Sequence, residues 1–545
     1  MSSRIIPLVC VLSGLLTSAP LSATTDAELA ATVAKRLHGD RTGACMAVAV
    51  IESGQVAHTY VCANDADRGR IGPDSAFEIG SVTKTMTAAL LARMIVDGKA
   101  SLDDPLSDWL PEGTHVPEFE GKPILLRHLV THTSGLPVLP SRLRAASMDD
   151  PYAKLDQAEL LASLEDVKLS AAPGTHFAYS NFAMMVLSGA IARRAGGDYE
   201  TLVKRELFAP LGMDRAYINL LPPGVKPAQG HTPNGQAAPA WHLQTDLAGV
   251  GGVRATLEDM VRYVQAQLGQ APKPLLPALQ LSQRQVSDAP PMAMNWMIAK
   301  FGERRVLTHE GATGGFSALA AFEPARKRGV VILSDTGWTS VGGLEPLGMA
   351  LLGTGTQAGP PRRETAADPE TLQALTGDYD MGGLRVRLLA RDGQLVVQPA
   401  GQPELVMGHD DAGDYYPRTL DALLTPEPTA SGMSFSWMQG GGRVMATRLD
   451  AASAPAVPAL SAAQLAEYAG TYPLVPGFEL KVAAIGDALT VQGTGQPAIV
   501  VEAVGKDRFS ATAVGAQFEF ERDVRGKVIA LVLRQNGQVL HGDRQ

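Results

Sequence analysis

The chain has 545 residues, of which 45% are hydrophobic and 19% are charged, and its formal net charge at pH 7 is -9. The length predicts several domains, and a mean hydropathy of +0.02 is typical of a globular protein. A pI near 5.7 argues against nucleic acid as a partner, because proteins that bind nucleic acid carry clustered positive charge.

The N-terminus has the pattern of a secretory signal. Arg4 precedes an apolar run over 5–16, and small residues follow it, with a cleavage position after Ala23. The run is shorter than the roughly 20 apolar residues that span a bilayer, and no later stretch is long enough either. We therefore expect a signal peptide over 1–23, removed on export to the periplasm or the medium, and no stable membrane span.

A β-hairpin is predicted after a first amphipathic helix over 26–37. Two β-prone apolar runs flank Ser53 and Gly54, which are typical turn residues. A two-residue turn there places position 45 opposite position 62 as a non-hydrogen-bonded pair, about 4.5 Å apart at Cα. An oxidising compartment permits disulfides. We therefore expect a disulfide between Cys45 and Cys62; the alternative is two reduced core cysteines.

The next stretch, 77–84, carries a candidate nucleophile. Ser81 follows a glycine at the predicted start of a helix, and Lys84, three residues later, lies on the same helical face. A serine hydroxyl needs a base to take its proton, and a lysine serves as that base when its pKa is lowered. Alone, Ser-x-x-Lys also occurs on ordinary capped surface helices, so its meaning depends on the rest of the chain.

The remaining elements predict one large domain with a sheet and a helical insertion, followed by a repeat. Helical patterns cover 124–131, 156–166 and 182–194, a further helix starts at Thr256, and strands are expected at 306–309, 316–322 and 329–334. A segment rich in Gly, Pro, Thr and Ala over 353–369 reads as a linker.

Beyond the linker, two copies of one pattern follow each other. The matching positions are Leu372, Gly377 and Tyr379 in the first copy and Leu465, Gly470 and Tyr472 in the second. Each copy is a series of short alternating strands with turns such as Asp392-Gly393 and Asn536-Gly537. Because each copy has its own set of turns, two small antiparallel barrels explain the repeat better than one sandwich.

Two further motifs complete a recognisable set. Tyr179-Ser180-Asn181 and His309-Glu310-Gly311 follow Ser81 and Lys84 in the order of the penicillin-recognising serine hydrolases. Over roughly Thr32 to Leu352 the chain resembles the branch that includes class C β-lactamases, D-alanyl-D-alanine carboxypeptidases, D-aminopeptidases and related esterases. The segments 102–105, 129–136, 207–213 and 311–316 agree with this resemblance.

The resemblance implies an α/β serine β-lactamase-like fold, with an antiparallel sheet plus a helical subdomain, followed by two small antiparallel β-barrels that look like lipocalin-like modules. The domains expected are a signal peptide over 1–23, a catalytic domain over 24–355 and barrels over 370–450 and 462–545.

The resemblance also implies catalytic roles. Ser81 attacks a carbonyl, and Tyr179, as a phenolate or through a proton shared with Lys84, accepts the serine proton and later protonates the leaving group. An ordinary tyrosine pKa is about 10, so this role needs a nearby ammonium to lower it. The backbone N–H groups of Ser81 and Ala312 would hold the oxyanion.

Four residues are expected to bind substrate. Asn181 offers its amide to a substrate carbonyl, His309 occupies a position where related enzymes have a cation, and Gly311 lets the substrate backbone approach the strand. Glu310 stands where related enzymes have a hydroxyl. A glutamate facing the substrate repels a carboxylate by about 4 kcal/mol at 4 Å, which favours neutral esters or peptides with a free amine. Alternatively, Glu310 points off the sheet into solvent.

The sequence therefore predicts an exported acyl-serine hydrolase that cleaves an amide or ester, with a D-amino-acid peptide or ester favoured over a lactam. The alternatives are a class C-like β-lactamase and a slowly reacting sensor of penicillins or peptidoglycan fragments. We expect a small molecule or short peptide as substrate and no cofactor. His128 and His132 have the spacing of metal ligands, but no third ligand accompanies them, so no metal is expected.

Overall fold

The structure is a computed structural model that describes residues 23–545, except for 145–148, 339–341, 401, 431, 440–441, 450–459, 476–477, 487, 495, 497, 512–513, 515 and 536–537. The expected signal peptide therefore lies, apart from Ala23, outside the described residues, as does the predicted turn at Asn536-Gly537.

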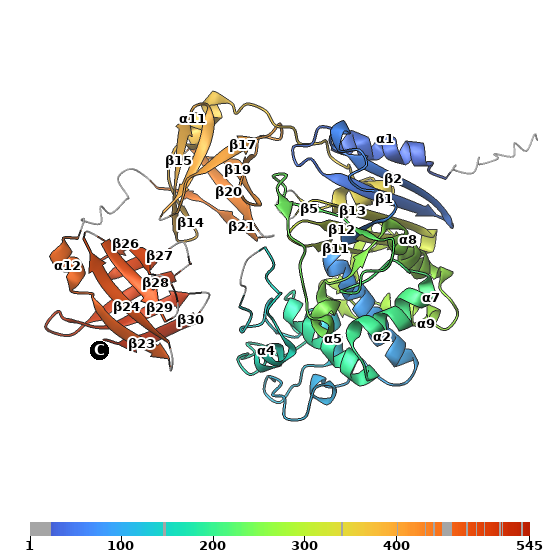
Figure 1. The fold of residues 1–545 in the computed structure, drawn as a ribbon, viewed down its shortest axis with the longest axis horizontal. Coiled ribbons are helices and arrows are strands. Elements are labelled where there is room, and N and C mark those ends of the chain that lie inside the picture. Colours follow the sequence, from blue (N-terminus) through green and yellow to red (C-terminus); the bar gives the residue numbers. More distant parts are fainter. Residues whose placement is uncertain are drawn as a thin grey trace, which may run out of the picture.

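Within the described residues, the N-terminal domain is built on an antiparallel sheet of eight strands in the order β2-β1-β13-β12-β11-β10-β9-β8 (Figure 1). The strands are β1 (Cys45–Glu52), β2 (Gln55–Cys62), β8 (Ser287–Asp288), β9 (Pro291–Met292), β10 (Met297–Phe301), β11 (Arg304–Ala312), β12 (Ser317–Glu323) and β13 (Arg328–Ser334). The three consecutive strands predicted near the end of the domain are thus present, and β1 closes back onto β13.

The β1–β2 hairpin forms through the expected two-residue turn. Ser53 and Gly54 both have positive φ, at 49° and 92°, as a tight hairpin turn of this twist requires. The resulting register pairs Cys45 with Cys62, and the two are joined by a disulfide with 3.9 Å between the Cα atoms. The disulfide prediction is confirmed.

Helices cover both faces of the sheet. The helices of this domain are α1 (Asp26–Leu37), α2 (Thr83–Val96), α3 (Leu126–Val130), α4 (Gln157–Ala162), α5 (Asn181–Ala195), α6 (Tyr199–Val203), α7 (Ala209–Leu211), α8 (Leu257–Gln265), α9 (Leu276–Ser282) and α10 (Glu345–Leu351). Alternate residues of β1 point to opposite faces, so that Met46, Val48 and Val50 join the core under α1 and α10. Ala47 and Ala49 join the larger core that holds α2, α5 and α8.

The helical predictions succeed where the apolar pattern is long. The structure gives α1 the predicted bounds, and α5 is buried along nearly its whole length. α4 is shorter than the predicted 156–166, and a 3-10 helix, Leu106–Trp109, follows Pro105. Five short strands lie outside the main sheet: β3 (Ser75–Glu78), β4 (Lys226–Pro227), β5 (Gly230–His231), β6 (Ala237–Ala238) and β7 (Arg254–Ala255).

Two nearly closed antiparallel barrels follow, and the first lies between the N-terminal domain and the second (Figure 1). The first comprises α11 (Pro369–Leu375), β14 (Gly377–Met381), β15 (Leu384–Arg391), β16 (Gln394–Pro399), β17 (Leu405–His409), β18 (Tyr415–Pro417), β19 (Ala422–Thr429), β20 (Gly432–Gln439), β21 (Gly442–Met445) and β22 (Thr447–Arg448). The second comprises α12 (Ala462–Ala466), β23 (Gly470–Val475), β24 (Phe478–Ile485), β25 (Ala488–Gly493), β26 (Ile499–Gly505), β27 (Arg508–Ala511), β28 (Ala516–Arg522), β29 (Val528–Gln535) and β30 (Gln538–Asp543).

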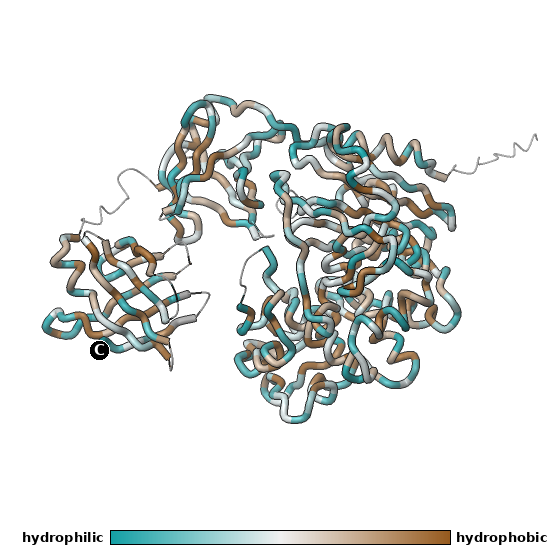
Figure 2. Tube along the Cα trace, viewed as in Figure 1, coloured by the Kyte–Doolittle hydropathy of each residue, from teal (hydrophilic) through white to brown (hydrophobic). Residues whose placement is uncertain are grey.

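The internal repeat has a structural counterpart. The buried hydroxyl of Tyr379 donates to the carbonyl of Leu375, and that of Tyr472 donates to the carbonyl of Tyr468, four residues back in both cases. Apolar segments run along the barrel strands and through the N-terminal sheet (Figure 2). In the described part of the chain, no helix is both long and apolar enough to cross a membrane.

Candidate active site

The turn that carries Ser81 presses against the end of β11. It is a single 3-10 turn, Gly80–Val82, that leads directly into α2. A Cβ on Gly311 would lie 2.0 Å from the Ile79 carbonyl oxygen, and one on Gly80 would lie 2.7 Å from the Ala312 nitrogen. Both positions therefore require glycine, because a side chain at either one would prevent the Ser81 turn from packing this closely against the end of β11. Gly311 was expected to make room for a substrate backbone, and this close approach explains the glycine instead.

Lys84 is placed as the sequence predicts, one helical turn from Ser81. Its Nζ lies 2.7 Å from the Ser81 Oγ, and it also donates to the carbonyl of Val250 at 2.7 Å. The side chain is fully buried, and this burial holds the pKa of Lys84 well below its usual value. The lowered pKa favours the neutral amine, which is the form of Lys84 that can accept a proton from Ser81.

Val250 is a contributor that sequence reasoning missed. It ends a 3-10 helix, Thr245–Val250, that packs against α2 and α5. The sequence signal was the glycine-rich turn at 249–252. A Cβ on Gly249 would lie 2.6 Å from the Ser188 Oγ and 2.7 Å from the Thr87 Oγ1, so only glycine lets this turn reach Lys84.

Tyr179 lies beside the pair in a partly buried position. The Lys84 Nζ is 5.1 Å from the centroid of its ring. Burial raises the pKa of the Tyr179 hydroxyl well above its usual value, and the Ser81 hydroxyl offsets only part of that rise. The expected net lowering of the Tyr179 pKa is absent, because the effect of burial is the largest one. Tyr179 is therefore a phenol and not a phenolate.

The start of α5 fixes the second motif. Ser180 caps the helix, since its Oγ accepts from the backbone N–H of Ala183 at 2.9 Å. Asn181 is the first helical residue, and its Nδ2 lies 3.4 Å from the hydroxyl of Tyr152. Among the residues that the structure describes, its buried Oδ1 has no hydrogen-bond partner. This oxygen is an unused acceptor close to Tyr179.

His309 faces Lys84 from β11 but carries no charge. Its Nδ1 lies 2.7 Å from the carbonyl oxygen of Glu310, so Nδ1 holds the proton and Nε2 is a free acceptor. Burial, with a smaller contribution from Lys84, lowers the pKa of His309 to about 3. The expectation of a cation at this position is therefore corrected to a neutral imidazole.

Glu310 points to the other face of the sheet. Leu307 belongs to the core on the Ser81 side and Val306 to the core on the α10 side, so Glu310, in step with Val306, faces α10. There its Oε1 accepts from the backbone N–H of Leu344 at 2.6 Å. This placement favours the alternative, in which Glu310 leaves the sheet on the face away from Ser81. The residue is exposed there, and one of its carboxylate oxygens is held by Leu344.

His132, to which the sequence assigned no role, is a second neighbour of the site. Its ring lies 4.3 Å from the ring of Tyr179, and its Nδ1 accepts from the backbone N–H of Ser180 at 3.2 Å. Burial, together with Lys84 and His309, lowers the pKa of His132 well below its usual value. The ring thus supports the second motif. In the described parts of the chain, no group of three or more His, Cys, Asp or Glu side chains could hold a metal.

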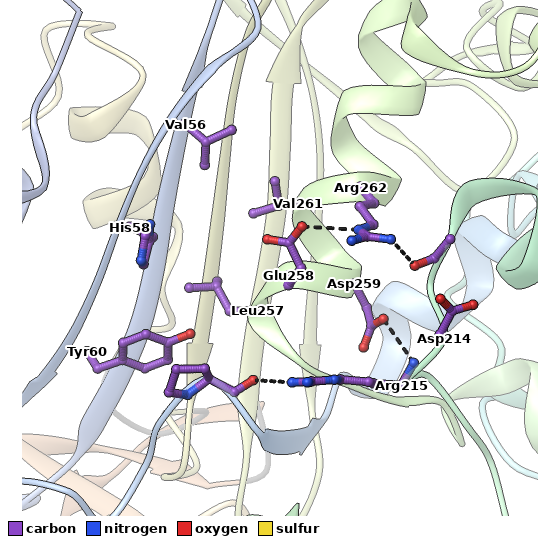
Figure 3. A pocket seen from close by; sticks show the side chains of 12 residues that line it. Val56, His58, Tyr60, Asp214, Arg215, Leu257, Glu258, Asp259, Val261 and Arg262 are labelled. Carbon is purple, nitrogen blue, oxygen red and sulfur yellow. Dashed lines mark hydrogen bonds and ion pairs between the residues drawn. The ribbon is translucent and has the colours of Figure 1, made fainter. Parts of the chain in front are cut away.

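A cavity of about 390 Å³ lies between β2 and α8, away from these residues (Figure 3). Its charged side chains largely pair with one another or with the backbone, as Glu258 does with Arg262 at 3.1 Å. Its lining includes none of the three proposed catalytic side chains. The chemistry of Ser81 therefore does not depend on this cavity.

Comparison with known proteins agrees with the motif set. The Beta-lactamase family model matches residues 29–343, and a domain of unknown function (DUF3471) matches residues 454–544. The chain is 30% identical over 307 residues to the D-alanyl-D-alanine-carboxypeptidase/endopeptidase AmpH of Escherichia coli (strain K12), covering 53% of this chain and 78% of that protein. It is 28% identical over 329 residues to a Beta-lactamase of the same strain, covering 53% and 83%. A solved β-lactamase/D-alanine carboxypeptidase from Yersinia pestis is 27% identical, covers 54% of this chain and 88% of its own, and has a TM-score of 0.47.

Proposed function

The chain belongs to the β-lactamase family and is a serine hydrolase, and from this premise we propose that it is an exported enzyme that cleaves an amide or ester through Ser81, Lys84 and Tyr179. The favoured substrate is a D-amino-acid peptide or ester. One observation carries the proposal: a fully buried lysine amine with a lowered pKa lies 2.7 Å from a partly exposed serine hydroxyl. Export rests on the signal pattern at 1–23.

The first half of the reaction follows from this geometry. Lys84 takes the proton of the Ser81 hydroxyl while Oγ forms a bond to the substrate carbonyl carbon, and the carbonyl oxygen becomes an oxyanion between the N–H groups of Ser81 and Ala312. The proton then passes from Lys84 through the Tyr179 hydroxyl to the leaving nitrogen or oxygen as its bond to carbon breaks. The products of this half are the freed amine or alcohol and an acyl-serine, which water hydrolyses by the same steps in reverse order.

The charges around Ser81 support a substrate without a carboxylate beside the scissile bond. His309 is neutral, the lowered pKa of Lys84 favours its neutral amine, and Glu310 faces α10, so these residues offer little positive charge to pair with a carboxylate. An ion pair that is missing from a buried site leaves the substrate charge desolvated and unpaired, which is costly. A D-amino-acid ester, or a peptide cut away from its C-terminus, meets this requirement. β-Lactam hydrolysis is the second candidate, supported by the 28% identical relative.

The test is intact-mass detection of the acyl-enzyme with nitrocefin, D-alanyl peptides and short-chain esters. We expect one added acyl group per chain with esters and D-amino-acid substrates, and none in Ser81→Ala. Loss of the nucleophile lowers kcat by several orders of magnitude. If Ser81→Ala keeps kcat within about tenfold, the proposed mechanism is wrong. Fast turnover of nitrocefin alone would select the β-lactamase alternative.

A further inference from the structure

Two aromatic side chains connect the two sides of the Ser81 site. The rings of Tyr152 and Trp241 meet edge to face with 5.4 Å between centroids. The hydroxyl of Tyr152 lies 3.4 Å from Asn181 at the start of α5. At the other end, a Cβ on Gly314 would lie 2.9 Å from the Trp241 Nε1, so the indole packs directly on the loop that follows β11. The pair therefore spans the space between the second motif and the third.

A buried ion pair holds Trp241 in place by its backbone. The Glu78 Oε1 accepts from the N–H of Trp241 at 2.9 Å, and Arg254 donates to the Trp241 carbonyl at 2.5 Å. Glu78 and Arg254 also pair with each other at 3.0 Å. Glu78 lies only three residues before Ser81, so the position of the indole is tied to the strand that leads to the nucleophile.

A second link joins the two segments that carry the aromatic rings. The backbone N–H of His242 donates to the Asp150 Oδ1 at 2.9 Å, and the His242 Nδ1 lies 2.7 Å from the Asp150 Oδ2. Asp150 precedes Tyr152 by two residues, and His242 follows Trp241. Both rings are therefore held in place by contacts of neighbouring residues: Tyr152 belongs to the buried core, and Trp241 packs against that core while remaining partly exposed.

The choice of tryptophan at 241 has a cost in stability. Within the described residues, its buried Nε1–H has no hydrogen-bond partner. Buried polar groups are normally paired, and an unpaired one destabilises the fold. A phenylalanine would fill most of the same space without this penalty. Local costs of this kind are expected where function and not stability determines the residue.

We propose that Trp241 and Tyr152 form an aromatic wall that limits the acyl group of the substrate and makes the enzyme selective for short acyl groups. This inference rests on the proposed function, in which the Ala312 N–H marks the position of the reacting carbonyl. Gly314 follows Ala312 by two residues, so the indole that packs on it lies beside that carbonyl, where it can meet the acyl group.

The test compares kcat/KM for 4-nitrophenyl acetate and 4-nitrophenyl octanoate in wild type, Trp241→Ala, Tyr152→Ala and Trp241→Phe. The wild type is expected to prefer acetate. Removing either ring should raise the octanoate-to-acetate ratio at least tenfold, because six additional methylene groups find apolar space. Trp241→Phe keeps a ring at the wall, so it should keep the wild-type ratio with an equal or higher melting temperature.

The possible outcomes distinguish failure of the wall proposal from failure of the assignment of Ser81 as nucleophile. Ser81→Ala is assayed with the same two esters, and if it retains turnover the proposed function fails. If Ser81→Ala is inactive but both ring-deleting variants keep the wild-type ratio, the wall proposal is overturned while the nucleophile assignment stands. If one ring-deleting variant fails to fold, as its melting curve would show, the other variant still tests the proposal, because the wall requires both rings.

Discussion

At the scale of the residue, burial decides what each ionisable group of the site can do. Burial lowers the pKa of Lys84 and so favours its neutral amine, and burial of Tyr179 raises the pKa of its hydroxyl and so keeps it protonated. A lysine that would be protonated in water is thus shifted toward the form that can act as a base, while the tyrosine stays a neutral phenol that can carry a proton. Neither shift could be read from the motif, because each depends on residues far along the chain.

The activity should follow the deprotonation of Lys84. Because the amine form is the base, kcat/KM is expected to rise with pH through the lowered pKa of Lys84 and then stay level, since Tyr179 keeps its proton. The pKa of His309 is about 3, so it does not titrate between pH 5 and 9. The pH at which kcat/KM rises should therefore be the same in His309→Asn as in the wild type. If the rise of kcat/KM with pH disappears in His309→Asn, the titrating group is the imidazole instead.

Glu310 shows how one side chain can be misassigned by motif alone. The residue was expected at the substrate because its neighbours are site residues, yet a strand sends consecutive side chains to opposite faces. His309 and Gly311 face Ser81, and Glu310 therefore faces α10. The alternation of side chains along the predicted strand could be inferred from the sequence. The contact with Leu344 could not, because it depends on how α10 packs.

Replacement of Glu310 should affect stability and not selectivity. Glu310→Ala removes the acceptor for the Leu344 N–H and is expected to cost about 1 kcal/mol in the free energy of unfolding. Glu310→Gln keeps an acceptor oxygen and serves as the control. In Glu310→Thr, the ratio of kcat/KM between carboxylate-bearing and neutral substrates should match the wild type. A gain for carboxylate-bearing substrates would restore the original assignment of Glu310 to the substrate site.

At the scale of the element, local rules account for much of the fold. The two-residue turn at Ser53 and Gly54 fixed the hairpin register and hence the disulfide, because only neighbours in sequence determine it. The spacing of Ser81 and Lys84 likewise follows from one helical turn. The carbonyl of Val250 could not be found in this way, since 166 residues separate it from Lys84 and only tertiary packing brings them together.

The short helix α3 depends on a neutral histidine. The Nδ1 of His128 accepts from the backbone N–H of Leu125 at 3.0 Å, which a protonated ring could not do. Burial first, and then the charge of Arg127, lower the pKa of His128 from 6.5 to about 4. The folded-state pKa is depressed, so the unfolded state binds more protons between pH 6.5 and 4. The associated stability is complete above pH 6.5 and is lost as the pH falls.

His128→Gln should remove this acid sensitivity while keeping a capping acceptor. Between pH 7 and 5 the wild type is expected to lose about 2 kcal/mol more unfolding free energy than the variant, as measured by urea denaturation at both pH values. At pH 7 the two proteins should differ by less than about 1 kcal/mol. Equal losses in both proteins would mean that His128 keeps its ordinary pKa in the folded state.

At the scale of the whole molecule, the first barrel is attached to the N-terminal domain by buried charges. Arg41 pairs with Asp410 at 2.8 Å, and their side chains are 1% and 0% exposed. Arg362, from the segment between the two units, pairs with the same carboxylate at 3.0 Å. The guanidinium of Arg41 also lies 3.6 Å from the centroid of the Tyr416 ring. Asp410 thus pairs with both arginines, and Asp414 supplies a second carboxylate to Arg362.

Removal of Asp410 should therefore loosen the whole assembly. Asp410→Ala leaves Arg41 and Arg362 with less compensation in a buried place, and breaking such a pair costs about 3–5 kcal/mol. The matched control is Glu404→Ala, which breaks the exposed pair with Arg391 on the same barrel and should change stability far less, because solvent screens an exposed ion pair. Urea denaturation measures both changes. Proteolysis of the 353–369 segment should also become faster in Asp410→Ala alone, because Arg362 lies in it and loses a partner. Equal effects of the two substitutions would show that this charge cluster contributes no more than a surface ion pair.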